Sequence, residues 1–239
     1  MDTNRKTARF VGAFFLTSNV TFILGAIVLI ESILGAPDYL TLISNSRTQV
    51  ILGVLLEWIN VLAFVGIAVL LFPILKHRFE SLALAYVGFR VIEFILQLAA
   101  DISPLALLNL SEDFGKAGAP GAASYQALGA LLLAERFWAF QMLNLVFGLS
   151  ALMLYSMLYR AKLIPRFISV WGLVGAALVL ANTVFDMFGI SLGVLGNLGI
   201  LMLLNEVFLG VWLIVKGFSP SAEAYEPAMD FKPGAVAQP

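Results

Sequence analysis

The sequence predicts an all-α membrane protein, a bundle of six transmembrane helices, and two observations lead to this fold class. Of the 239 residues, 61% are hydrophobic and only 12% are charged, and the mean hydropathy is +0.96. A soluble globular chain carries about 25% charged residues. The apolar residues also fall in blocks of about 20 or more, which is the length that a helix needs to cross the hydrocarbon core of a bilayer.

Six such blocks follow one another along the chain. The predicted spans are residues 10–30, 50–75, 82–109, 130–159, 167–188 and 198–215. The first is longer than the roughly 7–15 apolar residues of a signal peptide, so we expect it to stay uncleaved. Residues 1–217 then form one transmembrane domain, and residues 218–239, with four of the nine prolines, form a disordered cytoplasmic tail.

The connections between the blocks are polar or rich in glycine. We expect loops at residues 35–49, 111–124 and 189–197, and an interfacial lead-in from Tyr125 to the fourth span. Pro73 and Pro104 stand near the ends of the second and third apolar blocks. Because proline removes a helical hydrogen bond, we expect these two residues to close their spans.

Basic residues are concentrated on one side of the predicted bundle. Six spans put both termini on the same side, and the connections on that side hold ten Lys and Arg residues against two on the other. Because loops rich in Lys and Arg are usually on the cytoplasmic side of the membrane, both termini are predicted to be cytoplasmic. The ten are Arg5, Lys6, Arg9, Lys76, Arg78, Arg160, Lys162, Arg166, Lys216 and Lys232, and the two are Arg47 and Lys116.

The two halves of the chain show a weak internal similarity. Residues 58–71 align with residues 167–180 without a gap, and the third and sixth spans each carry an acid, Glu93 and Glu206. Two units of three spans would be inverted relative to each other, as in many transporters. Apolar segments match one another easily, so this 3+3 inverted repeat is an alternative and not a requirement of the fold.

The third predicted span carries a line of polar residues along one face. Arg90, Glu93, Gln97 and Asp101 recur at helical spacing, so their side chains share one side of the helix. Charged residues are rare inside a bilayer unless they face protein or water. We therefore expect this face to point into the bundle.

Acids outnumber arginines within the predicted spans, six to two. A charge at the centre of a bilayer costs at least about 2.5–3.5 kcal/mol, so the acids must pair with arginine, take up a proton or reach water. We expect Asp101, Asp186 and Asn197 to be solvated at the outer edge. In an alternative role, the guanidinium group of Arg136 binds an anionic ligand through two parallel hydrogen bonds. The candidate ligand- or proton-binding residues are Arg90, Glu93, Gln97, Glu135, Arg136, Asn205, Glu206 and Glu57.

Three functional interpretations fit these candidates. In the leading one, the protein binds or transports a small ligand or protons through an outward-facing cavity, which Arg90, Glu93 and Glu206 gate, with Glu93 or Glu206 as the titrating group. In the second, it is a non-catalytic scaffold or regulatory subunit, and the buried charges only fix helix packing. In the third, paired acids form an intramembrane enzyme, although no catalytic motif is present.

Composition excludes several kinds of chemistry. The chain has no cysteine, so it has no disulfide and no thiol nucleophile, and its single histidine, His77, argues against a histidine metal site or haem ligation. The net charge of −1 gives no indication of nucleic-acid binding. We therefore expect no cofactor or metal, and a lipid bilayer as the surrounding partner.

Several short motifs, taken together, resemble a known family. They are Ala8-Arg9-x-x-Gly12, Arg90-x-x-Glu93, Pro165 at the start of the fifth span, and a closing Glu206-x-x-x-Gly210-x-Trp212-Leu213-Ile214-x-Lys216-Gly217-Phe218. Over residues 7–218 the chain resembles the bacterial six-span membrane proteins catalogued as a domain of unknown function. The resemblance implies a protein of the bacterial inner membrane and no particular activity. It favours Arg90, Glu93 and Glu206 as the centre of the site.

Overall fold

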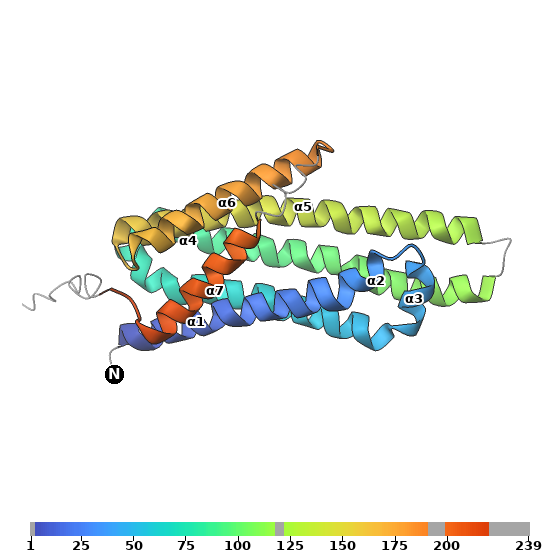
Figure 1. Cartoon of the computed structure of the whole chain (residues 1–239), viewed down its shortest axis with the longest axis horizontal. Helices are drawn as coiled ribbons and strands as arrows, with labels where there is room; N and C mark the ends of the chain where they lie inside the picture. The colour runs from blue at the N-terminus through green and yellow to red at the C-terminus, as the bar shows by residue number, and fades with distance from the viewer. Residues whose placement is uncertain (1–2, 118–121, 191–198, 220–239) are drawn as a thin grey trace, which may run out of the picture.

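The computed structural model describes residues 3–117, 122–190 and 199–219, and every regular element in these ranges is a helix (Figure 1). The predicted all-α fold is thus confirmed. The elements are α1 (Thr3–Phe22), the π-helical segment η1 (Ile23–Glu31), α2 (Ser32–Leu34), α3 (Tyr39–Asn45), α4 (Arg47–Ala117), α5 (Ala122–Ala161), α6 (Arg166–Met187) and α7 (Ile200–Val215).

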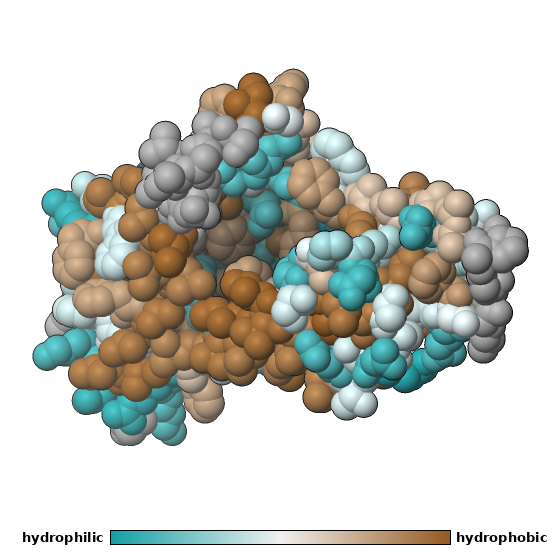
Figure 2. All heavy atoms as spheres, turned by 45° about the vertical axis from the view of Figure 1, so that its right-hand side comes forward, coloured by the Kyte–Doolittle hydropathy of each residue, from teal (hydrophilic) through white to brown (hydrophobic). Residues whose placement is uncertain are grey.

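Four of the helical stretches are long and apolar enough to cross a membrane. They are residues 4–34, 47–115, 122–161 and 166–187, and α7 is apolar but shorter. Hydrophobic residues dominate the middle of the face in Figure 2, whereas hydrophilic residues lie toward its left edge and over the right-hand lobe. Such a surface suits lipid around the middle and water at the ends, so these helices indicate an integral membrane protein.

Helix α4 is a hairpin of two long arms. Phe79 has non-helical angles (φ −141°, ψ 50°), and the chain reverses there. The arms run side by side, because Arg47 lies 2.8 Å from Glu112 and Gln97 donates to Glu57 at 2.8 Å. The two arms contain the second and third predicted spans.

Neither proline in α4 ends its helix. Pro73 and Pro104 both lie inside α4, so the expectation that they close the spans was wrong. A proline removes one backbone hydrogen bond, and within an apolar segment the neighbouring helices and local adjustments of the backbone accommodate that loss. The turn between the arms instead falls at Phe79, six residues beyond Pro73.

Two of the expected loops are largely helical. Residues 35–49 contain α3 and the start of α4, and residues 111–124 contain the end of α4 and the start of α5. Helix α3 forms because Leu40 and Ile43, three residues apart, both enter a small hydrophobic core with Ile30, Val50 and Leu107. The expected loop 189–197 and the tail from residue 220 lie almost entirely outside the described residues.

One end of the bundle collects the basic connections. Figure 1 places the start of α1, the bend in α4, the α5–α6 turn and the end of α7 at the same end. The Arg160 guanidinium lies 5.0 Å from the Phe79 ring, and the Ser219 amide donates to the Leu163 carbonyl at 2.8 Å. Arg47 lies at the opposite end, with α3. The start of α1, the bend in α4, the α5–α6 turn and the end of α7 therefore lie at one end of the molecule.

Helices α1 and α7 cross in backbone contact. A Cβ atom added to Gly12 would lie 2.5 Å from the Gly210 carbonyl oxygen, and one added to Gly210 would lie 3.0 Å from the Gly12 oxygen. Small residues permit such close helix approach in membranes. These glycines belong to the opening and closing motifs of the chain, so the crossing explains why both motifs contain glycine.

Candidate functional site

The second arm of α4 buries its whole polar face. Arg90 and Asp101 are each 1% exposed, and the residues between them on this face are almost as deeply buried. We expected Asp101 to be solvated at the membrane edge, and this expectation was wrong. Asp101 is buried because Gln97 donates to it at 3.0 Å and Arg136 lies 3.4 Å away.

Arg90 is the centre of the first cluster of buried charges. Its Nη1 lies 2.6 Å from Glu93 Oε2, and its Nε donates to the Tyr86 hydroxyl at 3.3 Å. The guanidinium packs on two phenyl rings, 4.3 Å from the centre of Phe64 and 5.2 Å from that of Phe147. Ion pairing and cation–π contact together compensate a charge that is removed from water.

Glu206 faces this cluster from α7. Asn19 of α1 donates to Glu206 Oε2 at 3.3 Å, and the carboxylate interacts electrostatically with Arg90 and Glu93. The other oxygen of Glu206, Oε1, is buried and has no hydrogen-bond partner among the described residues. The same holds for Arg90 Nη2 and the Tyr155 hydroxyl, which are also buried. Such orphaned polar atoms indicate a place where water or a ligand completes the network.

A second cluster is built around Arg136 of α5. Its Nη2 lies 2.8 Å from Glu57 Oε1, its Nη1 lies 3.4 Å from Asp101 Oδ1, and its Nε lies 3.3 Å from Glu31 Oε1. Gln97 donates to both Glu57 and Asp101, at 2.8 and 3.0 Å. Arg136 therefore holds η1, both arms of α4 and α5 together from inside.

A cavity of about 780 Å³ lies beside the first cluster. Its walls come from α1 and η1, both arms of α4, α5, α6 and α7. Figure 2 shows a recess in the molecular surface with hydrophilic residues inside it and hydrophobic residues below it. The charged residues among its described lining are all acids, and they are Glu31, Glu93 and Glu206. Its amides are Asn19, Asn60, Gln97, Asn144 and Asn182, and its aromatic rings are Phe22, Phe64, Phe140 and Phe147.

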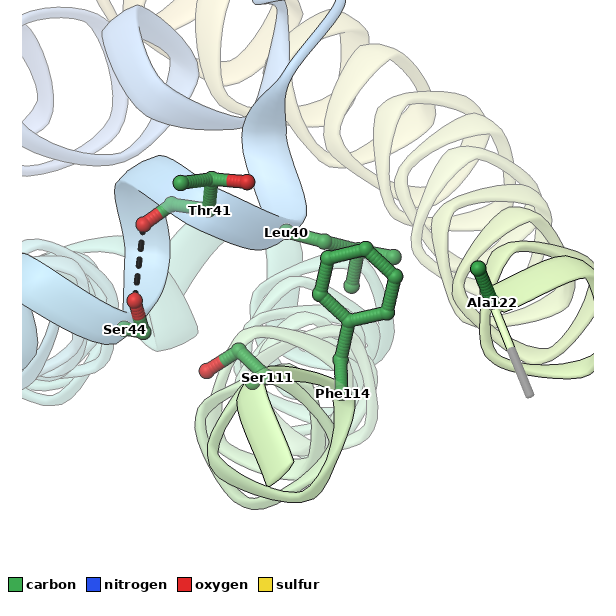
Figure 3. Close-up of a pocket in the computed structure, with 7 residues that line it drawn as sticks. Leu40, Thr41, Ser44, Ser111, Phe114 and Ala122 are labelled. Carbon is green, nitrogen blue, oxygen red and sulfur yellow. Dashed lines mark hydrogen bonds between the residues drawn. The ribbon is translucent and has the colours of Figure 1, made fainter. Parts of the chain in front are cut away.

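A smaller pocket lies near α3, at the other end of the bundle. It has a volume of about 410 Å³, and Figure 3 shows Phe114 and Leu40 among the residues around it, with the Ser44 hydroxyl donating to the Thr41 carbonyl at 2.7 Å. No charged side chain belongs to its described lining. The larger cavity is therefore the candidate functional site.

The structure separates the predicted candidates into groups. Glu93, Gln97 and Glu206 line the cavity, whereas Arg90 lies behind Phe64 and Phe147. Glu57 and Arg136 belong to the second cluster, which contacts the cavity through Gln97 and Glu31.

Two predicted candidates lie apart from both clusters. Glu135 of α5 is exposed, and its carboxylate accepts a hydrogen bond from the buried Ser103 of α4. Asn205 is buried against α6 and donates to the Ile168 carbonyl at 2.9 Å. Among the residues expected at the membrane edge, Asp186 is partly buried and accepts from Asn182 at 2.9 Å, and Asn197 lies outside the described residues.

Sequence reasoning missed four residues of the site. Asn19, Ser150 and Tyr155 are uncharged, and Glu31 follows directly after the expected end of the first span. Ser150 donates to Glu93 at 2.5 Å. A polar residue such as Asn19 in the middle of an apolar block was an available signal, because polar side chains within a span usually face protein.

Charged side chains enclosed by long apolar helices define the class of this protein: an α-helical integral membrane protein with a buried charge network. In the parts of the chain that the structure describes, no group of three or more His, Asp and Glu residues is placed to hold a metal ion. The family described as "Domain of unknown function (DUF4386)" matches residues 10–217, and the chain belongs to this family. No curated protein and no solved structure matches the chain.

Proposed function

We propose that this protein spans the bacterial inner membrane six times, with both termini in the cytoplasm, and binds a small ligand for transport in the cavity beside Arg90. The observation that carries the proposal is a cavity of about 780 Å³ lined by Glu93 and Glu206, where one buried carboxylate oxygen of Glu206 has no partner in the described part of the chain. Ligand sites in proteins have volumes of about 300–1,000 Å³ and combine apolar walls with a few convergent polar groups.

Six crossings follow from the helices if α4 crosses twice. Its two arms each exceed the roughly 20 residues that a span needs, and α1 with η1, α5 and α6 are also long enough. Helix α7 has 16 apolar-rich residues and packs against α1, which supports its assignment as the sixth span in this proposal. The basic connections at one end of the bundle support a cytoplasmic location for that end.

The charge balance supports a site that takes up a proton or a ligand. The two clusters together contain five acids and only two arginines, and all seven except Glu31 are buried. Buried acids in excess of their partners require compensation from protons, water or a cation. Glu206 is the acid that we propose for this exchange, because it lines the cavity and is outside ion-pair distance of arginine.

The proposal is tested by the water accessibility of single cysteines. The chain has no native cysteine, so Asn144→Cys places one thiol in the cavity, and Met142→Cys, two residues along α5, places one on the outer face. A thiol reacts as the thiolate, which requires water around it. We expect a membrane-impermeant maleimide added outside intact cells to label Asn144→Cys at least about ten times faster than Met142→Cys.

The result has two informative alternatives. Equal labelling of the two variants contradicts a water-filled cavity. Labelling of Asn144→Cys only in inverted vesicles keeps the cavity but reverses the side on which it opens.

One observation favours a structural role for part of the network. Arg136 is 3% exposed and contacts three acids, and the cluster around it meets the cavity only through Gln97 and through Glu31, whose side chain is 53% exposed. A buried and paired cluster is what a scaffold or regulatory subunit would use to fix helix packing. We propose this role for the Arg136 cluster and ligand binding for the cavity beside Arg90.

A further inference from the structure

The cavity has a chemical preference that its lining residues define. Resting on the proposed function, we infer that the ligand is an organic cation with a bulky apolar body. Three features of the cavity carry this inference: the sign of its charges, the aromatic rings in its wall and the unpartnered oxygen of Glu206.

All the charge displayed by the described lining is negative. Glu31, Glu93 and Glu206 line the cavity, and neither arginine of the two clusters does. Arg90 is held back by Phe64 and Phe147, whose rings line the cavity and contact its guanidinium. A ligand in the cavity therefore contacts carboxylates directly, whereas the phenyl rings separate it from the Arg90 guanidinium. This arrangement favours a cation over an anion.

The rest of the wall suits a large apolar group. Phe22, Phe140, Leu143 and Ile200 are among the residues that surround the acids, and the cavity offers much more apolar than polar surface. Aromatic rings also attract organic cations through their faces, most strongly where water is excluded. A small inorganic cation would leave this apolar surface in contact with water, whereas an apolar cation covers it.

Glu206 supplies the anchoring charge. Glu93 is paired with Arg90 at 2.6 Å and Glu31 with Arg136 at 3.3 Å, whereas Glu206 has, among the described residues, only the Asn19 amide as a hydrogen-bond donor. Its Oε1 is buried without a partner in the same part of the chain, and the Glu206 side chain lines the cavity. A cationic centre in the cavity beside this carboxylate would offset the excess of acids in the first cluster.

Two ions of similar shape and opposite charge test the inference. Tetraphenylphosphonium and tetraphenylborate are offered to the purified full-length protein in detergent, and binding is measured by equilibrium dialysis against protein-free micelles. We expect the phosphonium ion to bind and the borate ion to stay at the micelle background. The double variant Glu93→Gln/Glu206→Gln should bind the phosphonium ion at least about tenfold more weakly, because both charged partners are lost.

Glu112→Gln is the matched control. Glu112 is an exposed acid paired with Arg47 at the far end of the bundle, so this variant should bind the phosphonium ion like the wild type. Equal or preferred binding of the borate ion overturns the cation inference, and so does wild-type binding by the double variant. Neutral triphenylphosphine oxide separates the two proposals. If it alone binds, the cavity is a ligand site without cation preference, and if none of the three compounds binds, both the inference and the proposed ligand site fail.

Discussion

Replacing Arg136 with methionine is expected to lower the free energy of unfolding by about 3–5 kcal/mol, one of the two largest effects that we predict for a single substitution. Methionine keeps much of the length of the side chain but removes its charge. Glu57 and Asp101, each at most 2% exposed, then lose their ion-pair partner without gaining water. The measurement is reversible unfolding in mixed micelles, followed by tryptophan fluorescence.

A rescue variant distinguishes lost pairing from lost packing. The triple variant Arg136→Met/Glu57→Gln/Asp101→Asn also removes the two buried carboxylates that Arg136→Met leaves unpaired. It should therefore recover most of the lost stability. Arg47→Met is the surface control, because the side chains of Arg47 and Glu112 are 57% and 50% exposed. An exposed ion pair of this kind contributes at most about 1 kcal/mol. A triple variant that is no more stable than Arg136→Met would contradict the pairing that we assign to this cluster.

The other large effect is expected at the crossing of α1 and α7. Gly12→Ala places a methyl group 2.5 Å from the Gly210 carbonyl oxygen, and a backbone atom cannot move aside as a flexible side chain can. The two helices must separate, and overpacking of this kind costs about 1–3 kcal/mol, occasionally more. Since Asn19 and Glu206 meet across the same pair of helices, their contact should weaken as well.

Gly88→Ala provides the matched comparison. Gly88 lies inside α4, and a Cβ atom added there would have no neighbour within 4 Å. Alanine should therefore raise stability by about 0.5–1 kcal/mol, through its better helix propensity. The pair is compared by thermal unfolding in the same detergent, and a Gly12→Ala protein as stable as Gly88→Ala would rule out the backbone contact.

The helices could be predicted well from the sequence because many residues in each of them follow the same hydrophobic pattern. Apolar blocks of span length and a charged face at helical spacing on residues 90–101 were enough to predict the second arm of α4 and its inward side. The ends of the helices were harder to predict. Pro73 and Pro104 are strong local stop signals, yet α4 continues past both, because contacts with neighbouring helices outweigh one lost backbone bond.

Pairing within the site could not be derived from a single chain. Arg90 and Glu93 are three residues apart, so their ion pair was predictable from helical spacing. The partners of Arg136 come from η1 and both arms of α4, up to 105 residues away, and only the packing of the helices brings them together. Glu135 stands next to Arg136 in sequence but lies outside its cluster and accepts a hydrogen bond from Ser103, because adjacent residues on a helix face different directions.

Glu206 of α7 faces the interior of the bundle, where Asn19 of α1 donates to it. The most direct test of this orientation is cross-linking across α1 and α7 with a short bifunctional thiol reagent in this cysteine-free chain. Asn19→Cys/Glu206→Cys replaces two side chains in contact at 3.3 Å and should cross-link, whereas Val20→Cys/Phe208→Cys, at two outward-facing positions, should not. A cross-link in the second pair and none in the first would place Glu206 on the outer surface and contradict the account.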